Sequence, residues 1–74
     1  MEIDYKGFAI RLNFLMQEKG LNNEELAKRI GAYSTTISKW RHCKCQIGGI
    51  VTVQKLAKEF NVNPDWLLYG FIRR

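Results

Sequence analysis

The chain has 74 residues, of which 46% are hydrophobic and 12% aromatic, a composition typical of one globular domain with a small core. This length argues against a large enclosed active site, and the apolar content argues against a disordered chain. Twelve Lys and Arg residues against seven Asp and Glu residues give a net charge of +5, which favours a polyanionic partner.

The distribution of these charges is more informative than their sum. No acidic residue occurs between Glu25 and Glu59, whereas an ordinary solvated surface mixes both signs. The central part of the chain therefore carries a field of one sign, as expected of a surface that binds a polyanion. The basic residues within this span are Lys28, Arg29, Lys39, Arg41, Lys44, Lys55 and Lys58.

The sequence also indicates where the protein resides. No apolar run approaches the roughly 20 residues that span a bilayer, and the start, Met-Glu-Ile-Asp, lacks the basic region of a signal peptide. Cys43 and Cys45 are separated by one residue and cannot link distant segments, which favours a reducing compartment. We expect a cytoplasmic protein with no membrane contact, and one domain over residues 1–74 with its core at about residues 6–70.

The first helix is predicted over residues 6–19, where apolar residues recur at helical spacing and Gly20 provides a stop. Ile10, Phe14 and Met16 widen its apolar face beyond one stripe. We expect these three residues to pack against the last helix; a subunit contact is the alternative. The inward positions of this helix are Phe8, Leu12 and Leu15.

Two short helices joined by a tight turn are predicted within residues 23–40. Asn22 can cap the first of them, and Glu25, three residues later, completes a capping box. Gly31 then ends this helix, because glycine takes a positive φ without steric cost. The small residue Ala27 allows a second helix to cross closely. Two short helices packed in this way across a tight turn form a helix-turn-helix. The apolar positions that tie the pair to one core are Leu26, Ala27, Ile30, Ala32, Ile37 and Trp40.

The start of the third helix is less defined than its core face. It begins near Tyr33 or Ser34 and runs to about His42. A tyrosine side chain cannot cap a helix as serine or threonine can, so the cap can instead fall on Ser34. The sequence is compatible with either Tyr33 or Ser34 as the cap.

A loop is predicted over residues 43–49, followed by a fourth helix over residues 50–60. Asn63 followed by Pro64 is a strong start signal for a fifth helix, which Gly70 ends. The residues of these two helices that we expect to face the core are Val53, Leu56, Ala57, Phe60, Trp66, Leu67 and Leu68.

The face of the third helix opposite Ile37 and Trp40 is polar. A helix fits the major groove of DNA, where polar side chains reach the base edges. Lys39 can donate to guanine O6 and N7, and Thr35 offers a hydroxyl to a base or a methyl to thymine. Polar faces are common on exposed helices, so these roles depend on the helix-turn-helix frame. The residues predicted to face the bases are Ser34, Thr35, Ser38 and Lys39.

Phosphate contacts are predicted from the flanks of this helix. Asn23 lies at the start of the second helix, where backbone N–H groups and the helix dipole favour an anion. Arg41, His42 and Lys44 lie at or just past the end of the third helix. Tyr33 either lies along the sugar-phosphate backbone or packs partly into the core. Such contacts fix the register of a protein on DNA without reading its sequence.

Four segments carry a resemblance to a known family, the XRE family of Cro and phage-repressor type helix-turn-helix regulators. They are residues 21–27 (LNNEELA), 36–40 (TISKW), 56–60 (LAKEF) and 65–70 (DWLLYG). The resemblance covers about residues 6–70. It implies an all-α, compact five-helix, lambda-repressor-like domain that binds operator DNA as a homodimer, usually to repress transcription in a bacterium or phage. It also implies that Asn23 contacts phosphate, and that Ser34, Thr35 and Lys39 face bases.

The chain departs from this family's pattern around the third helix. Tyr33 stands where a serine or threonine cap is usual, and Arg41 and Cys43 replace a frequent glutamate and glycine. The loop from Cys45 to Gly49 is longer than usual and lacks the common proline. These differences bear on the phosphate contacts expected from Arg41 and Lys44.

Our leading hypothesis is a sequence-specific regulator of transcription that binds double-stranded DNA, a small dimeric repressor that reads the major groove with its third helix. An alternative is an antitoxin-type protein that binds a partner protein, through the apolar face at Ile10, Phe14 and Met16, and regulates its own operon. Both hypotheses include DNA binding, and they differ in the partner that the apolar face takes.

A minor alternative is a metal or thiol sensor built on His42, Cys43 and Cys45, since thiolate and imidazole are ligands for zinc and copper. Three ligands within four residues rarely surround one tetrahedral ion, and the chain has no further Cys or His. We therefore expect no metal and no cofactor. An enzyme is not expected, because the chain has neither a Ser-His-acid set nor a Gly-rich phosphate loop.

Overall fold

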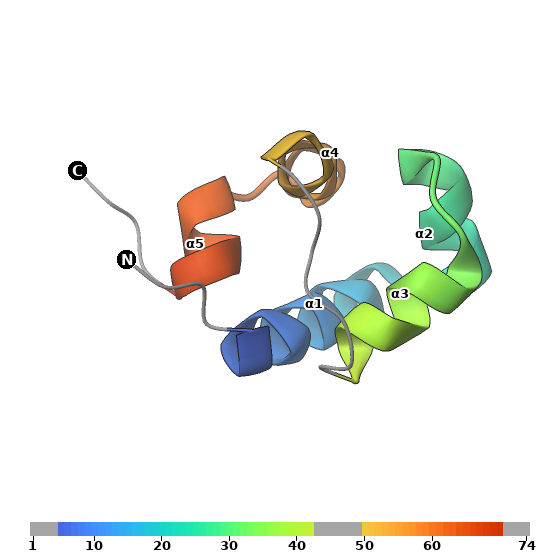
Figure 1. Ribbon diagram of the computed structural model, residues 1–74, viewed down its shortest axis with the longest axis horizontal. Coiled ribbons are helices and arrows are strands. Elements are labelled where there is room, and N and C mark those ends of the chain that lie inside the picture. Colours follow the sequence, from blue (N-terminus) through green and yellow to red (C-terminus); the bar gives the residue numbers. More distant parts are fainter. Residues whose placement is uncertain (1–4, 43–49, 71–74) are drawn as a thin grey trace.

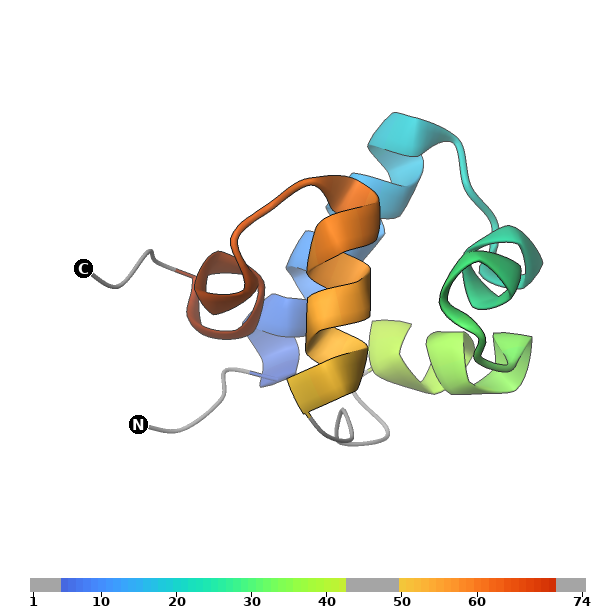
Figure 2. The same ribbon diagram turned by 90° about the horizontal axis from the view of Figure 1, so that it is seen from above.

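The computed structural model describes residues 5–42 and 50–70, which form five α-helices and contain no strand. They are α1 (Tyr5–Lys19), α2 (Asn23–Ile30), α3 (Ser34–Arg41), α4 (Ile50–Phe60) and α5 (Pro64–Tyr69). In Figure 1, α4 is seen end-on above α1, α5 lies on one side, and α2 and α3 form a pair on the other. The orthogonal view in Figure 2 shows α4 in the middle, between α5 and this pair. The expected five-helix, all-α fold is therefore confirmed.

A single hydrophobic core joins the five helices. Phe8 of α1 and Trp40 of α3 meet edge to face, with ring centroids 6.5 Å apart and planes at 72°, a geometry that aromatic pairs prefer. No polar or charged side chain is buried among the described residues. The largest fully buried side chains come from every helix and are Phe8, Leu12, Met16, Leu26, Ile37, Leu56 and Leu67.

Local sequence signals define both ends of α2. The Asn22 side chain accepts a hydrogen bond from the Glu25 backbone N–H at 2.8 Å, and the Glu25 carboxylate accepts one from the Asn22 N–H at 3.2 Å. This is the predicted capping box. Gly31 ends the helix with φ 71°, in the left-handed region, and its N–H donates to the Ala27 carbonyl. The turn to α3 thus follows from residues that the sequence identifies.

The structure fixes the start of α3, which the sequence left open. Tyr33 is the N-cap in an extended conformation, and its side chain makes no capping hydrogen bond. The Tyr33 carbonyl accepts the first helical bonds from Thr36 and Ile37. The alternative cap at Ser34 is therefore wrong. Ala32 packs against the core from the turn and does not belong to α3.

The start of α5 also follows its predicted signal. The Asn63 side chain accepts from the Asp65 N–H at 2.8 Å, Pro64 occupies the first turn, and Gly70 ends the helix in the left-handed region. The Arg11 side chain of α1 donates from Nε to the Leu67 carbonyl at 2.9 Å, so a cation lies at the negative end of α5. Leu67 and Leu68 are buried as predicted, and Trp66 packs partly against the core.

The prediction for the wide apolar face of α1 is wrong at two of three positions. Met16 is buried at 1% exposure, but Ile10 is 63% exposed and Phe14 is 54% exposed, so neither packs against α5. Ile10 and Phe14 each lie two residues from Leu12, which is 200° around an α-helix. Because Leu12 is fully buried, they must point away from the core. The helix also starts one residue earlier than predicted, at Tyr5.

None of the helices in residues 5–42 and 50–70 combines the length and the hydropathy that a membrane span requires. The loop predicted over residues 43–49 lies outside the described residues.

The turn at Gly31 generates a prediction about stability. Gly31→Ala meets no atom within 4 Å, so its effect isolates the backbone conformation, which is unfavourable for a residue with a Cβ atom. We expect a loss of about 1 kcal/mol in the free energy of unfolding, measured by urea denaturation. Gly31→Asn is the matched control and should lose less, because asparagine tolerates this region. Equal losses for both variants would contradict the conformational explanation.

Candidate nucleic-acid interface

The helix-turn-helix consists of α2, the turn at Gly31 and α3. Leu26 on α2 and Ile37 on α3 are fully buried, and Ala27 is small enough for close packing between the two helices. The Ala32 N–H donates to the Ala27 carbonyl at 2.9 Å, which closes the turn. The pair is thereby held against the core as one unit, and the side of α3 opposite Ile37 faces outward.

Polar residues occupy this outward side of α3. Thr35 and Lys39 are exposed, and Ser34 and Ser38 are half-buried. Three of these four predicted base-facing residues, together with His42, line one open hollow of about 380 Å³; Ser34 lies in the first turn, outside its lining. The structure thus brings Thr35, Ser38, Lys39 and His42 to one surface.

The ring of His42 is held against the last turn of α3. Its Nδ1 lies 2.7 Å from the Ser38 carbonyl oxygen. A carbonyl can only accept a hydrogen bond, so Nδ1 must carry the proton and donate. This fixes the orientation of the ring at the edge of the hollow and leaves Nε2 on its other side.

Arg41 joins three helices. Its Nη1 donates to the Asn23 side-chain oxygen of α2 at 2.6 Å, and its Nε donates to the side-chain oxygen of Asn13 on α1. Asn13 in turn donates from Nδ2 to the Arg41 carbonyl at 3.3 Å. The predicted phosphate residues Asn23 and Arg41 are therefore in direct contact. Asn13 was not predicted from the sequence, because its partner lies 28 residues away and no local pattern indicates the pair.

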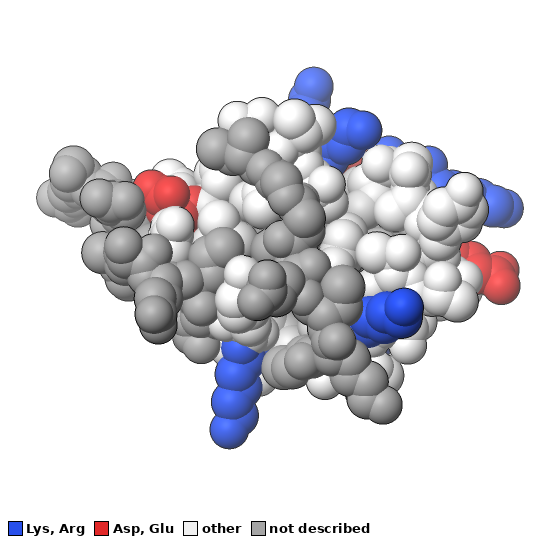
Figure 3. Space-filling view, viewed as in Figure 1, with Lys and Arg blue, Asp and Glu red and all other residues white. Residues whose placement is uncertain are grey.

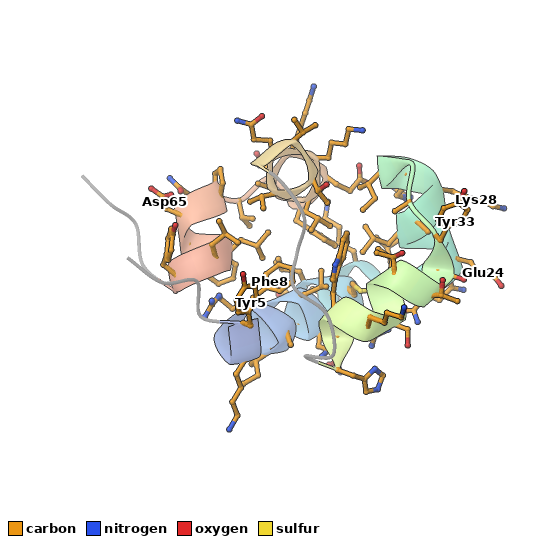
Figure 4. All side chains as sticks on the ribbon, viewed as in Figure 1. Tyr5, Phe8, Glu24, Lys28, Tyr33 and Asp65 are labelled. Atoms are coloured by element: carbon orange, nitrogen blue, oxygen red, sulfur yellow. The ribbon has the colours of Figure 1, made fainter. Side chains whose placement is uncertain are left out.

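The remaining predicted phosphate residues are placed differently. Tyr33 is 79% exposed at the turn between α2 and α3, so the alternative that it packs partly into the core is wrong (Figure 4). His42 borders the hollow beside Ser38 and Lys39. Lys44 lies outside the described residues.

The hypothesis of a metal or thiol sensor rests on His42, at the C-terminal end of α3, and on Cys43 and Cys45. In the described part of the chain, no three His, Cys, Asp or Glu side chains are grouped closely enough to hold a metal ion. Cys43 and Cys45 lie outside that part.

Most of the described basic residues between Glu25 and Glu59 are exposed, but one of them forms an ion pair. Arg29 of α2 forms a 2.7 Å ion pair with Glu59 of α4, which offsets its positive charge. In the face shown in Figure 3, a basic side chain stands on α3 and others lie at the margins, while acidic groups lie at the edges over α5 and beside α2. The middle of this view, apart from the residues drawn in grey, carries no acidic group.

These features define a helix-turn-helix domain of the kind found in DNA-binding transcriptional regulators. A family model described as a helix-turn-helix domain matches residues 9–70, and the chain belongs to this XRE-type family. The resemblance read from the sequence is thereby confirmed. A search of curated proteins gave no match.

Solved structures agree with this assignment. The restriction-modification controller C.AhdI from Aeromonas hydrophila is 28% identical, with a TM-score of 0.78 over 88% of this chain and 97% of that chain. The SOS-response transcriptional repressor LexA from Eubacterium rectale is 27% identical, with a TM-score of 0.80 over 95% and 77%. The P22 c2 repressor, solved with synthetic operator 9T, is 23% identical and shares the fold, with a TM-score of 0.80 over 86% and 96%. The family is one of DNA-binding regulators, and these three neighbours are described as a controller protein and as repressors.

The Arg41 contacts generate a second prediction. Arg41→Lys keeps the positive charge but loses the planar group that reaches Asn13 and Asn23 together. We expect a loss of about 1 kcal/mol in the free energy of unfolding, because the contacts are only partly buried. Lys39→Ala, on the exposed side of the same helix, is the control and should change stability by less than about 0.5 kcal/mol. Urea denaturation of both variants measures the difference, and similar values for the two would rule out a structural role for Arg41.

Proposed function

We propose that this protein is a sequence-specific transcriptional regulator, a small dimeric repressor that places α3 in the major groove of double-stranded DNA. The observation that carries the proposal is the outward face of α3, where Thr35, Ser38 and Lys39 surround one hollow while Ile37 anchors the opposite side in the core. A helix fixed in this way can enter the groove without reorganising, so little ordering free energy is lost on binding.

Each base-facing residue has a chemical role in this proposal. Lys39 is exposed and long enough to donate to guanine O6 and N7. Thr35, one turn earlier, offers a methyl group to thymine or a hydroxyl to a base edge. The shorter Ser34 and Ser38 contact either a base or a nearby phosphate.

The phosphate contacts in this proposal begin at the contact between Arg41 and Asn23. The side-chain oxygen of Asn23 accepts from Arg41, so its Nδ2 is the group left to donate to a phosphate at the start of α2. A guanidinium has five N–H groups, and the contacts with Asn13 and Asn23 use two of them. Arg41 can therefore position Asn23 and bind a phosphate itself. The exposed Tyr33 hydroxyl, His42 and Lys44 extend the contacts along the backbone.

The assignment as a repressor rests on the neighbours. The solved structures of LexA and P22 c2 are described as repressors, and the latter is bound to an operator. We extend this role to the present chain, together with binding as a dimer to two half-sites roughly 34 Å apart. The cytoplasm is the compartment that this role requires.

Selection of bound sequences from a random pool of DNA duplexes tests this proposal most directly. We expect enrichment of a two-fold symmetric sequence with half-sites about one helical turn apart. Lys39→Ala should weaken binding to the selected duplex about ten- to a hundredfold, since a good base contact contributes about 1–3 kcal/mol. Lys55→Ala, an equal change of charge on the exposed side of α4, is the control and should have a much smaller effect. A pool without enriched sequences would contradict the proposal.

The dependence of binding on salt provides a separate prediction. Each neutralised phosphate releases counterions, so affinity should fall steeply as the salt concentration rises. Asn23→Ala removes a neutral donor and should weaken binding without changing the slope of log Kd against log salt. Loss of a cationic phosphate contact by Arg41→Gln should reduce this slope by about one unit. Fluorescence anisotropy with the selected duplex measures both quantities, and a flat salt response would contradict phosphate binding.

A further inference from the structure

The outward face of α1 carries a regular row of four exposed residues. Ile10 and Phe14 lie one turn apart at its centre and are two of the four large exposed hydrophobic side chains among the described residues. Lys6 lies one turn before them and Glu18 one turn after, and both are exposed. Neither charged residue forms an ion pair with another described residue. The row, with four-residue spacing, therefore reads positive, apolar, apolar, negative.

This row is complementary to itself. Positions 6 and 18 are equally far from Leu12, and so are positions 10 and 14. A two-fold axis perpendicular to α1, level with Leu12 but on the exposed side of the helix, places Lys6 of one copy beside Glu18 of a second copy, and Ile10 beside Phe14. The same operation repeats both pairs, as an isologous contact requires. A partner of another sequence would not require this symmetry.

We propose that this face of α1 is the contact between the two copies of the chain, with the two α1 helices antiparallel. The four residues form an i±4 ridge, and such ridges from two helices interdigitate when the axes cross at about −50°. The apolar pairs are removed from water at the centre, and the ion pairs at the rim set the orientation. This inference rests on the proposed function, because it assigns the surface through which the proposed dimer forms.

The small size of this contact determines its strength. One face of one helix buries less than the roughly 1,200 Å² of a standard stable interface. The free protein is therefore a weak, concentration-dependent dimer, and binding of both copies to one operator raises the effective concentration of each at the contact.

Charge reversal tests the proposal without DNA. Lys6→Glu or Glu18→Lys alone sets like charges against each other in both rim pairs and should raise the Kd for self-association about tenfold at low salt. The double variant Lys6→Glu/Glu18→Lys exchanges the two charges and should return the Kd to within about twofold of the unchanged chain. Sedimentation equilibrium measures the Kd, and circular dichroism checks that each variant retains its helices.

An apolar pair of variants provides the matched control. Phe14→Ala should weaken self-association, whereas Val51→Ala, at an exposed apolar residue of α4, should leave it unchanged. The proposal is overturned if the unchanged chain stays monomeric at all accessible concentrations, if the single charge reversals associate normally, or if the double variant is not restored. A monomeric chain would leave this face to a different protein partner.

Binding to a duplex with one half-site separates this proposal from the proposed function. The variants at Lys6 and Glu18 should bind a single half-site within about twofold of the unchanged chain, because neither residue belongs to the α3 surface. Their loss should appear only in cooperative binding to the full site. Failure of every variant and of the unchanged chain to bind DNA would contradict the proposed function and leave the self-association result intact.

Discussion

The orientation of α3 depends on the burial of one side of two very short helices. With eight residues each, α2 and α3 are too short to persist alone in water. Burying a Leu or Ile side chain contributes about 1.5–3 kcal/mol, and Leu26 and Ile37 are both fully buried. The exposed ion pair between Arg29 and Glu59 contributes at most about 1 kcal/mol. Burial in the core therefore determines which side of α3 faces outward, and the surface ion pair contributes less to this orientation.

Hydrogen bonds from Arg41 further constrain the orientation of α3 that burial in the core establishes. Arg41 bonds to Asn13 and Asn23, so the end of α3 is connected to α1 and to the start of α2. These bonds are directional, unlike apolar burial, and constrain rotation of the helices about their axes. The helix-turn-helix thus has an apolar attachment along its inner side and a polar one at the end of α3. In the proposed complex, the same arginine lies beside the phosphate backbone.

Features set by nearby residues could be predicted from the sequence. The capping box at Asn22 and the start at Asn63 depend on residues two or three positions apart, and both are confirmed. Contacts between distant segments could not be predicted in this way, which is why the bond between Asn13 and Arg41 was missed. Tyr33 was undecided because an aromatic side chain at a helix start is compatible with the core or with solvent, and only the packing of the whole domain selects between them. The roles of the outward residues on α3 stay predictions.

In the proposed dimer, α1 has a function on each of its sides. Its inner side packs Phe8 against Trp40 and so holds α3, while its outer side carries the row from Lys6 to Glu18. Asn13 lies between the two sides and contacts the end of α3. One rigid helix would then set both the orientation of each α3 and the distance between the two copies of α3. The spacing of the operator half-sites would follow from the crossing angle of the two α1 helices, because Phe8 and Asn13 of α1 contact the proposed recognition helix directly.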